Sequence, residues 1–170
     1  MILPNPGRRH PCNDAETMLL SYLEMNRNAF RPKVPDEWLF LGPADYFLKN
    51  GWFFDPNDDV RAPHGIPGFC FANAYRLARR LPERYLYAEG YAVSSAGHVH
   101  SHAWCCTPRS QAYDPSWTAH GAGGIGSAYF GVVFTLEFLA KHKRKYKVAV
   151  PVVENWKADY PILSRRRRRL

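Results

Sequence analysis

The stretch Gly68-Phe69-Cys70-Phe71-Ala72-Asn73-Ala74 carries the most information about the fold. Pro67, a residue that interrupts regular structure, comes directly before this stretch. Apolar residues at helical spacing follow as far as Leu81. Pro82 then ends the pattern, because proline lacks a backbone donor and clashes with the preceding turn. We therefore predict a helix that opens near this cysteine and places a thiol at its N-terminus.

Patterns elsewhere in the chain predict a mixed α+β fold. Short apolar segments between turn signals indicate strands at residues 85–93, 99–106, 111–114, 129–134 and 148–153. Asn13 and Glu16 form a capping-box pair that opens an earlier helix, and Thr135 opens a later one. Residues 31–67 predict short helical turns and loops, since they are dense in Pro, Gly, Asp and Asn. The order of elements favours a helix-borne cysteine packed on a largely antiparallel sheet.

Three histidines, His98, His100 and His102, alternate along one face of a predicted strand. His102 lies deepest in that strand, next to the apolar run that contains Trp104. It is the candidate base for the thiol, because a neighbouring imidazole converts a thiol to a thiolate at neutral pH. His98 and His100 fit a polar turn better.

Asp114 ends the next short strand, in Tyr113-Asp114-Pro115. Few residues join this strand to the one that carries His102, so we expect the two to pair as a hairpin. The carboxylate would then accept the second N–H of the imidazole and fix its tautomer. Asp-Pro is also a common turn former, and that alternative has no catalytic content.

The composition is that of one globular domain, with 170 residues, 46% hydrophobic and 22% charged. We predict a single catalytic domain over residues 13–160, preceded by an extension over 1–12 and followed by a basic tail over 161–170. The four cysteines do not resemble a disulfide framework, since Cys105 and Cys106 are adjacent. No apolar run approaches the ~20 residues of a membrane span. These features favour a cytoplasmic protein with reduced thiols and no membrane partner.

The positive charge is concentrated at one end of the chain. The formal net charge is +8, and a run of five arginines begins at Arg165 and ends at Arg169, so the rest of the chain carries +3. Such a run is usually a solvated tail. It also suits nucleic acid or an acidic surface, bound in a salt-dependent way, and the tail is the only part of the chain through which nucleic acid would be bound.

Together these residues resemble the papain-like and transglutaminase-like superfamily of thiol enzymes, in which a helix-borne Cys precedes a strand His and then a strand Asp or Asn. The matching words are Gly-Phe-Cys-Phe-Ala-Asn-Ala around Cys70, His-Ala-Trp at His102 and Tyr-Asp-Pro at Asp114. The resemblance covers about residues 64–134 and is greatest for the transglutaminase-like branch. It implies a hydrolase such as a thiol protease or amidase, or a transferase such as a transglutaminase, acting on a peptide, protein, small amide or thioester without a cofactor.

The resemblance also implies further site residues. Papain-type enzymes bind the oxyanion partly through a glutamine six residues before the cysteine, and this position is His64 here, which can donate the same bond. Trp104, Trp117 and Tyr129 are candidates for the wall of a substrate pocket. The glycine-rich loop 121–126 is a candidate lid.

Two other interpretations stay open. A metal enzyme would hold zinc or iron with ligands taken from His98, His100, His102, Asp114, Cys105, Cys106 and His120. A catalytically inactive binding module would use the same fold with its basic tail. In the interpretation that we favour, Cys70, His102 and Asp114 form a catalytic triad and no metal is bound.

Overall fold

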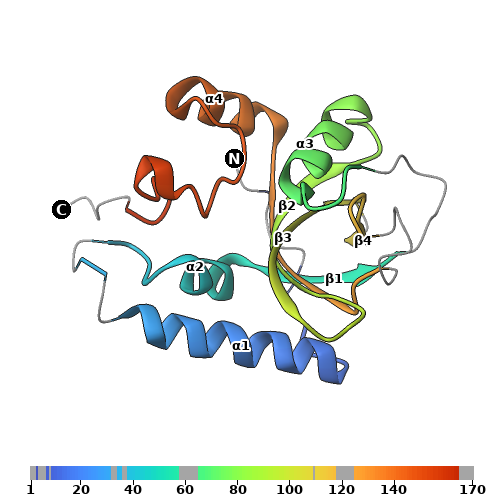
Figure 1. Cartoon of the computed structure of the whole chain (residues 1–170), viewed down its shortest axis with the longest axis vertical. Coiled ribbons are helices and arrows are strands. Elements are labelled where there is room, and N and C mark those ends of the chain that lie inside the picture. Colours follow the sequence, from blue (N-terminus) through green and yellow to red (C-terminus); the bar gives the residue numbers. More distant parts are fainter. Residues whose placement is uncertain are drawn as a thin grey trace.

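The computed structural model describes residues 3, 7, 9–31, 34–35, 38–57, 65–108, 110–117 and 125–164. These residues form a mixed α+β structure (Figure 1). The elements, in chain order, are α1 (Asp14–Phe30), α2 (Pro43–Asn50), β1 (Trp52–Pro56), α3 (Cys70–Arg80), β2 (Leu86–Val93), β3 (Val99–Cys106), β4 (Gln111–Tyr113), β5 (Ala128–Phe134), α4 (Leu136–Tyr146) and the 3₁₀ helix η2 (Trp156–Ala158).

The five strands form a closed barrel in the order β1, β4, β3, β2, β5. β2 is antiparallel to β3 and β5, and β3 is antiparallel to β4. β1 closes the barrel by pairing antiparallel with β5 and parallel with β4. The predicted α+β class is confirmed, whereas the closure into a barrel and the parallel pair were not expected from the sequence.

Side chains alternate between the interior and the outer face of the barrel. The large side chains of the interior are Trp52, Phe54, Trp104 and Tyr129. On the outer face of β3, Ala103 and Cys105 join the larger core beneath the helices, and the Cys105 thiol donates to the Ala74 carbonyl of α3 at 3.3 Å. Figure 1 shows α3 and α4 on one side of the barrel and α1 and α2 on the other.

Two glycines bring the strands close together beside His102. Gly90 pairs with His102 in β3 and with Gly131 in β5. A Cβ at Gly90 would overlap the backbone of Phe130 and Gly131, and a Cβ at Gly131 would overlap the backbone of Glu89. Glycine at both positions therefore permits the close backbone approach in this part of the wall.

The predicted helix starts at Asn13 and Thr135 are confirmed. Asn13 accepts a hydrogen bond from the Glu16 N–H at 2.8 Å, and Thr135 accepts one from the Phe138 N–H at 3.2 Å. The Glu16 carboxylate reaches back to the N–H of Cys12 at 2.8 Å, one residue before the N-cap. Local side-chain chemistry thus sets where α1 and α4 begin.

The segment 31–67 contains more regular structure than predicted. α2 begins with Pro43 in its first turn, a position where the missing N–H costs nothing. β1 contains Trp52, Phe53 and Phe54, and all three are buried. An aromatic strand that is buried on both faces shows no alternation of apolar and polar residues, so the sequence pattern did not reveal it.

The predicted strand at 148–153 is wrong, because this segment runs without strand pairing. The N–H groups of Val152 and Val153 donate to the carboxylate of Glu89 at 2.7–3.1 Å. Glu89 lies on the outer face of β2, is 1% exposed, and also accepts a 2.6 Å hydrogen bond from the Tyr87 hydroxyl. A buried carboxylate satisfies the backbone here in place of a neighbouring strand.

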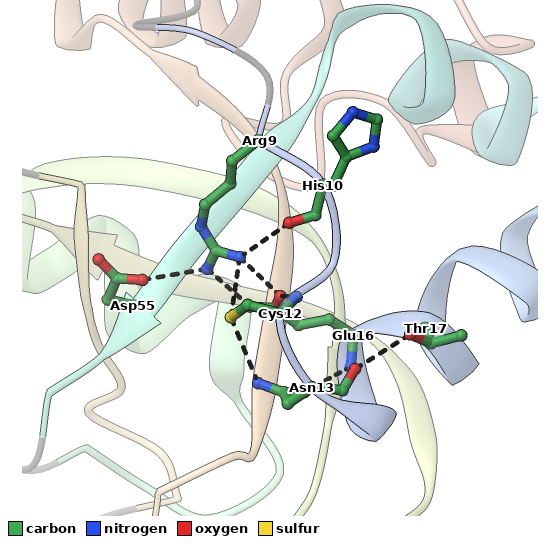
Figure 2. A network of polar contacts seen from close by, with 7 residues as sticks. All are labelled: Arg9, His10, Cys12, Asn13, Glu16, Thr17 and Asp55. Atoms are coloured by element: carbon green, nitrogen blue, oxygen red, sulfur yellow. Dashed lines mark hydrogen bonds and ion pairs between the residues drawn. The ribbon is translucent and has the colours of Figure 1, made fainter.

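The segments that flank the predicted domain also pack on its body. Figure 2 shows the guanidinium of Arg9 between α1 and β1, where it donates to both carboxylate oxygens of Glu16 at 2.6 Å and to Asp55 at 3.0 Å. At the other end, the side chain of Leu163 is fully buried. Arg9 and Leu163 therefore contact the body of the protein from positions outside the predicted domain bounds.

Candidate active site

Cys70 is the first residue of α3, as predicted. The N-cap residue Phe69 makes no side-chain capping hydrogen bond, so the first N–H groups of the helix are not capped in this way. Gly68, in the preceding turn, has φ +79, a left-handed conformation that favours glycine. The Cys70 thiol is partly buried and free of disulfide bonding. The helix N-terminus favours negative charge at this sulfur.

His102 and Asp114 are brought together by the predicted hairpin of β3 and β4, in which Cys105 pairs with Tyr113. The Nε2 atom of His102 lies 2.6 Å from Oδ2 of Asp114. The imidazole is 3% exposed and the carboxylate is fully buried. This is a short, desolvated, charge-assisted hydrogen bond.

Both oxygens of the Asp114 carboxylate accept hydrogen bonds from described residues besides His102. Its Oδ2 atom also accepts from the Tyr129 hydroxyl at 3.0 Å. Its Oδ1 atom accepts from the backbone N–H groups of Ser116 at 2.8 Å and Trp117 at 3.1 Å. Donors on both oxygens fix the orientation of the carboxylate, and with it the orientation of the His102 ring.

The pKa of His102 is raised to about 9. Burial acts in the opposite direction and would lower it, because burial penalises the charged imidazolium. The charge of Asp114, its hydrogen bond and a hydrogen bond with Cys70 outweigh that effect. Because Nε2 of the ring is hydrogen-bonded to Asp114, Nδ1 is the ring nitrogen that can interact with the Cys70 thiol. His102 is therefore cationic at neutral pH, and Cys70, the candidate nucleophile, is close enough to contribute to the raised pKa.

Asn73 ties α3 to the turn that carries Asp114, a role that we did not predict. Its Nδ2 atom donates to the Ile66 carbonyl at 2.6 Å and to Ser116 Oγ at 3.0 Å, and its Oδ1 accepts from the Ile66 N–H at 3.1 Å. Asn73 is 4% exposed. The available signal was a polar residue three positions after Cys70, within the apolar stripe of the helix.

The three candidate pocket residues occupy different environments. Trp117 is half-buried, and its ring stacks on His102. Trp104 and Tyr129 are fully buried, and their ring centroids lie 5.2 Å apart inside the barrel. Trp104 and Tyr129 therefore contact protein side chains and do not line an open pocket, and Tyr129 acts on the site by donating to Asp114.

The two histidines that precede His102 in the sequence, His98 just before β3 and His100 within it, do not contribute to this pair. His98 and His100 are exposed, and the His100 ring lies 5.8 Å from that of Trp117. Among the described residues, no group of three or more His, Cys, Asp or Glu side chains could hold a metal ion. His64, His120, positions 121–124 of the glycine-rich loop and the arginine run 165–169 lie outside the described residues.

No family model, curated protein or solved structure matches this chain. Within the described part of the chain, no helix is long and apolar enough to cross a membrane. The chemistry of the site is therefore inferred from its own residues.

Proposed function

We propose that this protein is a cysteine-dependent acyl-transfer enzyme, with Cys70 as nucleophile, His102 as general base and acid, and Asp114 as the residue that orients the imidazole. The observation that carries the proposal is the 2.6 Å contact between His102 and Asp114, on an imidazole whose pKa is raised by Asp114 and also by Cys70. A thiol at a helix N-terminus next to an imidazolium is favoured as the thiolate, which is the nucleophilic form.

The reaction begins from an ion pair, in which the proton of the Cys70 thiol already resides on His102. The thiolate attacks the carbonyl carbon of an amide or thioester, and the carbonyl oxygen becomes an oxyanion. In this proposal, backbone N–H groups in the first turn of α3 donate to that oxygen. His102 then protonates the leaving amine or thiol, which departs and leaves an acyl group on the sulfur. Water or an amine, deprotonated by His102, releases the acyl group and restores the thiol.

The finer assignment, a papain-like or transglutaminase-like core, belongs to the same proposal. It is supported by the chain order of the three residues and by a helix-borne cysteine packed against the strand of the histidine. His64 remains the predicted oxyanion donor. A cytoplasmic location is also proposed, because all four cysteines are free thiols and buried Cys105 and Cys106 are adjacent.

Thiol reactivity tests the proposal most directly. We would measure iodoacetamide modification at pH 7 by site-resolved mass spectrometry in the wild type, His102→Ala and Asp114→Asn. Cys12 is exposed and serves as an internal control thiol in every sample. We expect Cys70 to react at least about tenfold faster in the wild type than in His102→Ala, with the Cys12 rate unchanged. Equal Cys70 rates in wild type and His102→Ala would contradict the proposal.

A second measurement tests acyl transfer itself. Incubation with p-nitrophenyl acetate should place an acetyl group on Cys70 of the wild type, and the adduct should be lost in Cys70→Ala and slowed in His102→Ala. A stoichiometric metal in the purified protein, together with hydrolytic activity that survives Cys70→Ala, would instead favour the metal enzyme. The binding module would be favoured if the wild type forms no acyl adduct and if a partner still binds to the basic tail in Cys70→Ala.

A further inference from the structure

A small cavity lies on the outer face of β2, away from the thiol site. It has a volume of about 260 Å³ and is lined by side chains of α1, the start of α2, β2 and the C-terminal segment around η2. The side chains that decide its chemistry are Tyr91, Glu154, Trp156 and Tyr160. We propose that this cavity is a binding site for a methylated ammonium cation.

The carboxylate of Glu154 supplies the negative charge. Tyr91 and Ser101 are paired across β2 and β3, and their hydroxyls donate to its two oxygens, at 2.8 Å to Oε1 and 2.7 Å to Oε2. No lysine, arginine or histidine among the described residues forms an ion pair with Glu154. A fixed, half-buried carboxylate without a cationic partner in that part of the chain favours a ligand that brings the positive charge.

Aromatic rings supply the walls. Trp156 is 66% exposed, which is unusual for so large an apolar side chain. The Nζ atom of Lys157 lies 5.5 Å from the centroid of the Trp156 ring, so this ring already accepts a cation on its face. The Tyr160 ring is supported by Trp38, with centroids 5.9 Å apart. Rings around a carboxylate attract a cation through the negative faces of their π systems.

The backbone at Tyr160 adds an independent observation. Asp159 and Tyr160 are consecutive non-glycine residues with φ +54 and +48. Left-handed conformations at such residues are uncommon and costly, and they persist where the surrounding structure requires them. Here they place the Tyr160 side chain in the wall of the cavity.

Methylation of the cation follows from the hydrogen bonds. Each oxygen of Glu154 already accepts a hydroxyl hydrogen, and the rest of the wall consists of three aromatic residues together with Asn26, Pro43 and Ala44. A primary ammonium would lose hydration that these side chains replace poorly, whereas a quaternary ammonium has no N–H to satisfy. Its charge and methyl groups suit a carboxylate between rings.

The cavity is separate from the proposed catalytic residues. Ser101 and His102 are neighbours in β3 and point to opposite faces of the barrel wall. Ligand binding at Glu154 should therefore not depend on Cys70.

Titration calorimetry and ligand-observed NMR with choline test this proposal, and the neutral isostere 3,3-dimethyl-1-butanol is the matched control ligand. A peptide containing trimethyllysine, compared with the same peptide containing unmodified lysine, distinguishes a protein side chain from a free small molecule as the source of the group. We expect binding of choline or of the methylated peptide, and at least about fivefold weaker binding of the uncharged or unmethylated counterpart.

Variants locate the binding. Glu154→Gln and Trp156→Ala should each weaken the affinity at least about fivefold, and Cys70→Ala should leave it unchanged. Trp156 is exposed, so its replacement should leave the fold intact, and thermal unfolding checks this for both variants. The proposal would be overturned if the neutral isostere binds as tightly as choline, or if neither variant weakens the binding. It would also be overturned if neither choline nor the methylated peptide binds.

Discussion

The indole of Trp117 lies almost parallel to the imidazole of His102, with ring centroids 4.0 Å apart and planes inclined by 16°. The backbone N–H of the same tryptophan donates to Asp114. One residue therefore covers the His102 imidazole and also binds the Asp114 carboxylate that orients it. A covered ion pair interacts more strongly than one in water, because the local dielectric is lower.

Replacing Trp117 with alanine should expose this pair to water. We expect the free energy of unfolding to fall by roughly 1–3 kcal/mol, because a large, half-buried side chain is removed. The pKa of His102 should move from about 9 toward its ordinary value of 6.5, because water weakens both the burial that lowers it and the stronger attraction of Asp114 that raises it. Denaturant titration and NMR titration of the imidazole measure the two effects. Trp117→Phe retains a ring that can stack on the imidazole, so its stability and its His102 pKa should lie between those of the wild type and Trp117→Ala. A His102 pKa that is the same in the wild type and in both variants would show that Trp117 has no electrostatic effect on the pair.

Asp114→Asn removes the charge that holds His102 protonated. Burial then acts on the imidazole without a compensating carboxylate, so its pKa should fall from about 9 to below 6.5. In the wild type, the stability due to His102 is fully present below pH 6.5 and is lost as the pH rises through about 9, and this dependence should disappear in the variant. His142 is an internal reference for NMR, because burial lowers its pKa independently of Asp114. A His102 pKa that stays near 9 in Asp114→Asn would exclude Asp114 as the cause.

Glu89 should make the protein less stable as the pH rises from 4.5 to 7. Burial raises the pKa of this carboxyl to about 7, although Tyr87, Val153 and Val152 donate hydrogen bonds that favour the charged form. Between the two values the folded protein holds a proton that the unfolded chain has released, so the free energy of unfolding falls with pH, by roughly 2–3 kcal/mol in total.

Chemical denaturation at pH 5, 6, 7 and 8 measures this slope. Glu89→Gln should lower the stability at every pH, because an amide cannot accept all of these hydrogen bonds, yet its stability should change little between pH 5 and 6. An unchanged slope in the variant would assign the effect to another group.

Arg9→Gln tests the polar network ahead of α1 (Figure 2). Glu16 is 1% exposed, and its pKa is lowered: burial would raise it, but hydrogen bonds from Arg9 and Cys12 prevail. Its contribution to stability is therefore present above pH 4.5 and is lost as the pH falls through the lowered pKa. The variant should lose about 1–3 kcal/mol and unfold at a higher pH during acid titration. Arg9→Lys keeps the positive charge but cannot bond both oxygens of Glu16, so its stability should lie between those of the wild type and Arg9→Gln. Acid unfolding at the same pH in the wild type and both variants would show that Arg9 does not stabilise the charged form of Glu16.

The parts of the fold that the sequence predicted depend on neighbours close in the chain. Asn13 meets Glu16 within one turn, and His102 meets Asp114 across a short hairpin, so both relationships follow from local patterns. The strand at Trp52 was missed because its partners, such as Gly131, are distant and impose no local alternation.

The error at 148–153 has the same origin. A valine-rich segment has the composition of a strand, but its N–H groups bind Glu89, a residue that is 63 positions away from Val152. Asn73 also donates a hydrogen bond to Ser116, which is 43 positions away, and no short sequence pattern predicts that contact.

The closure of the barrel by β1 protects the alignment of the candidate site. β4 has only three residues, and a slip of one position against β3 would turn Asp114 to the opposite face and leave His102 without a carboxylate. β1 pairs with β4 at Asp55 and Gln111, which locks that short strand from its other edge. The N-terminal third of the chain contains none of the three proposed catalytic residues, yet its strand β1 fixes the register in which His102 and Asp114 face each other.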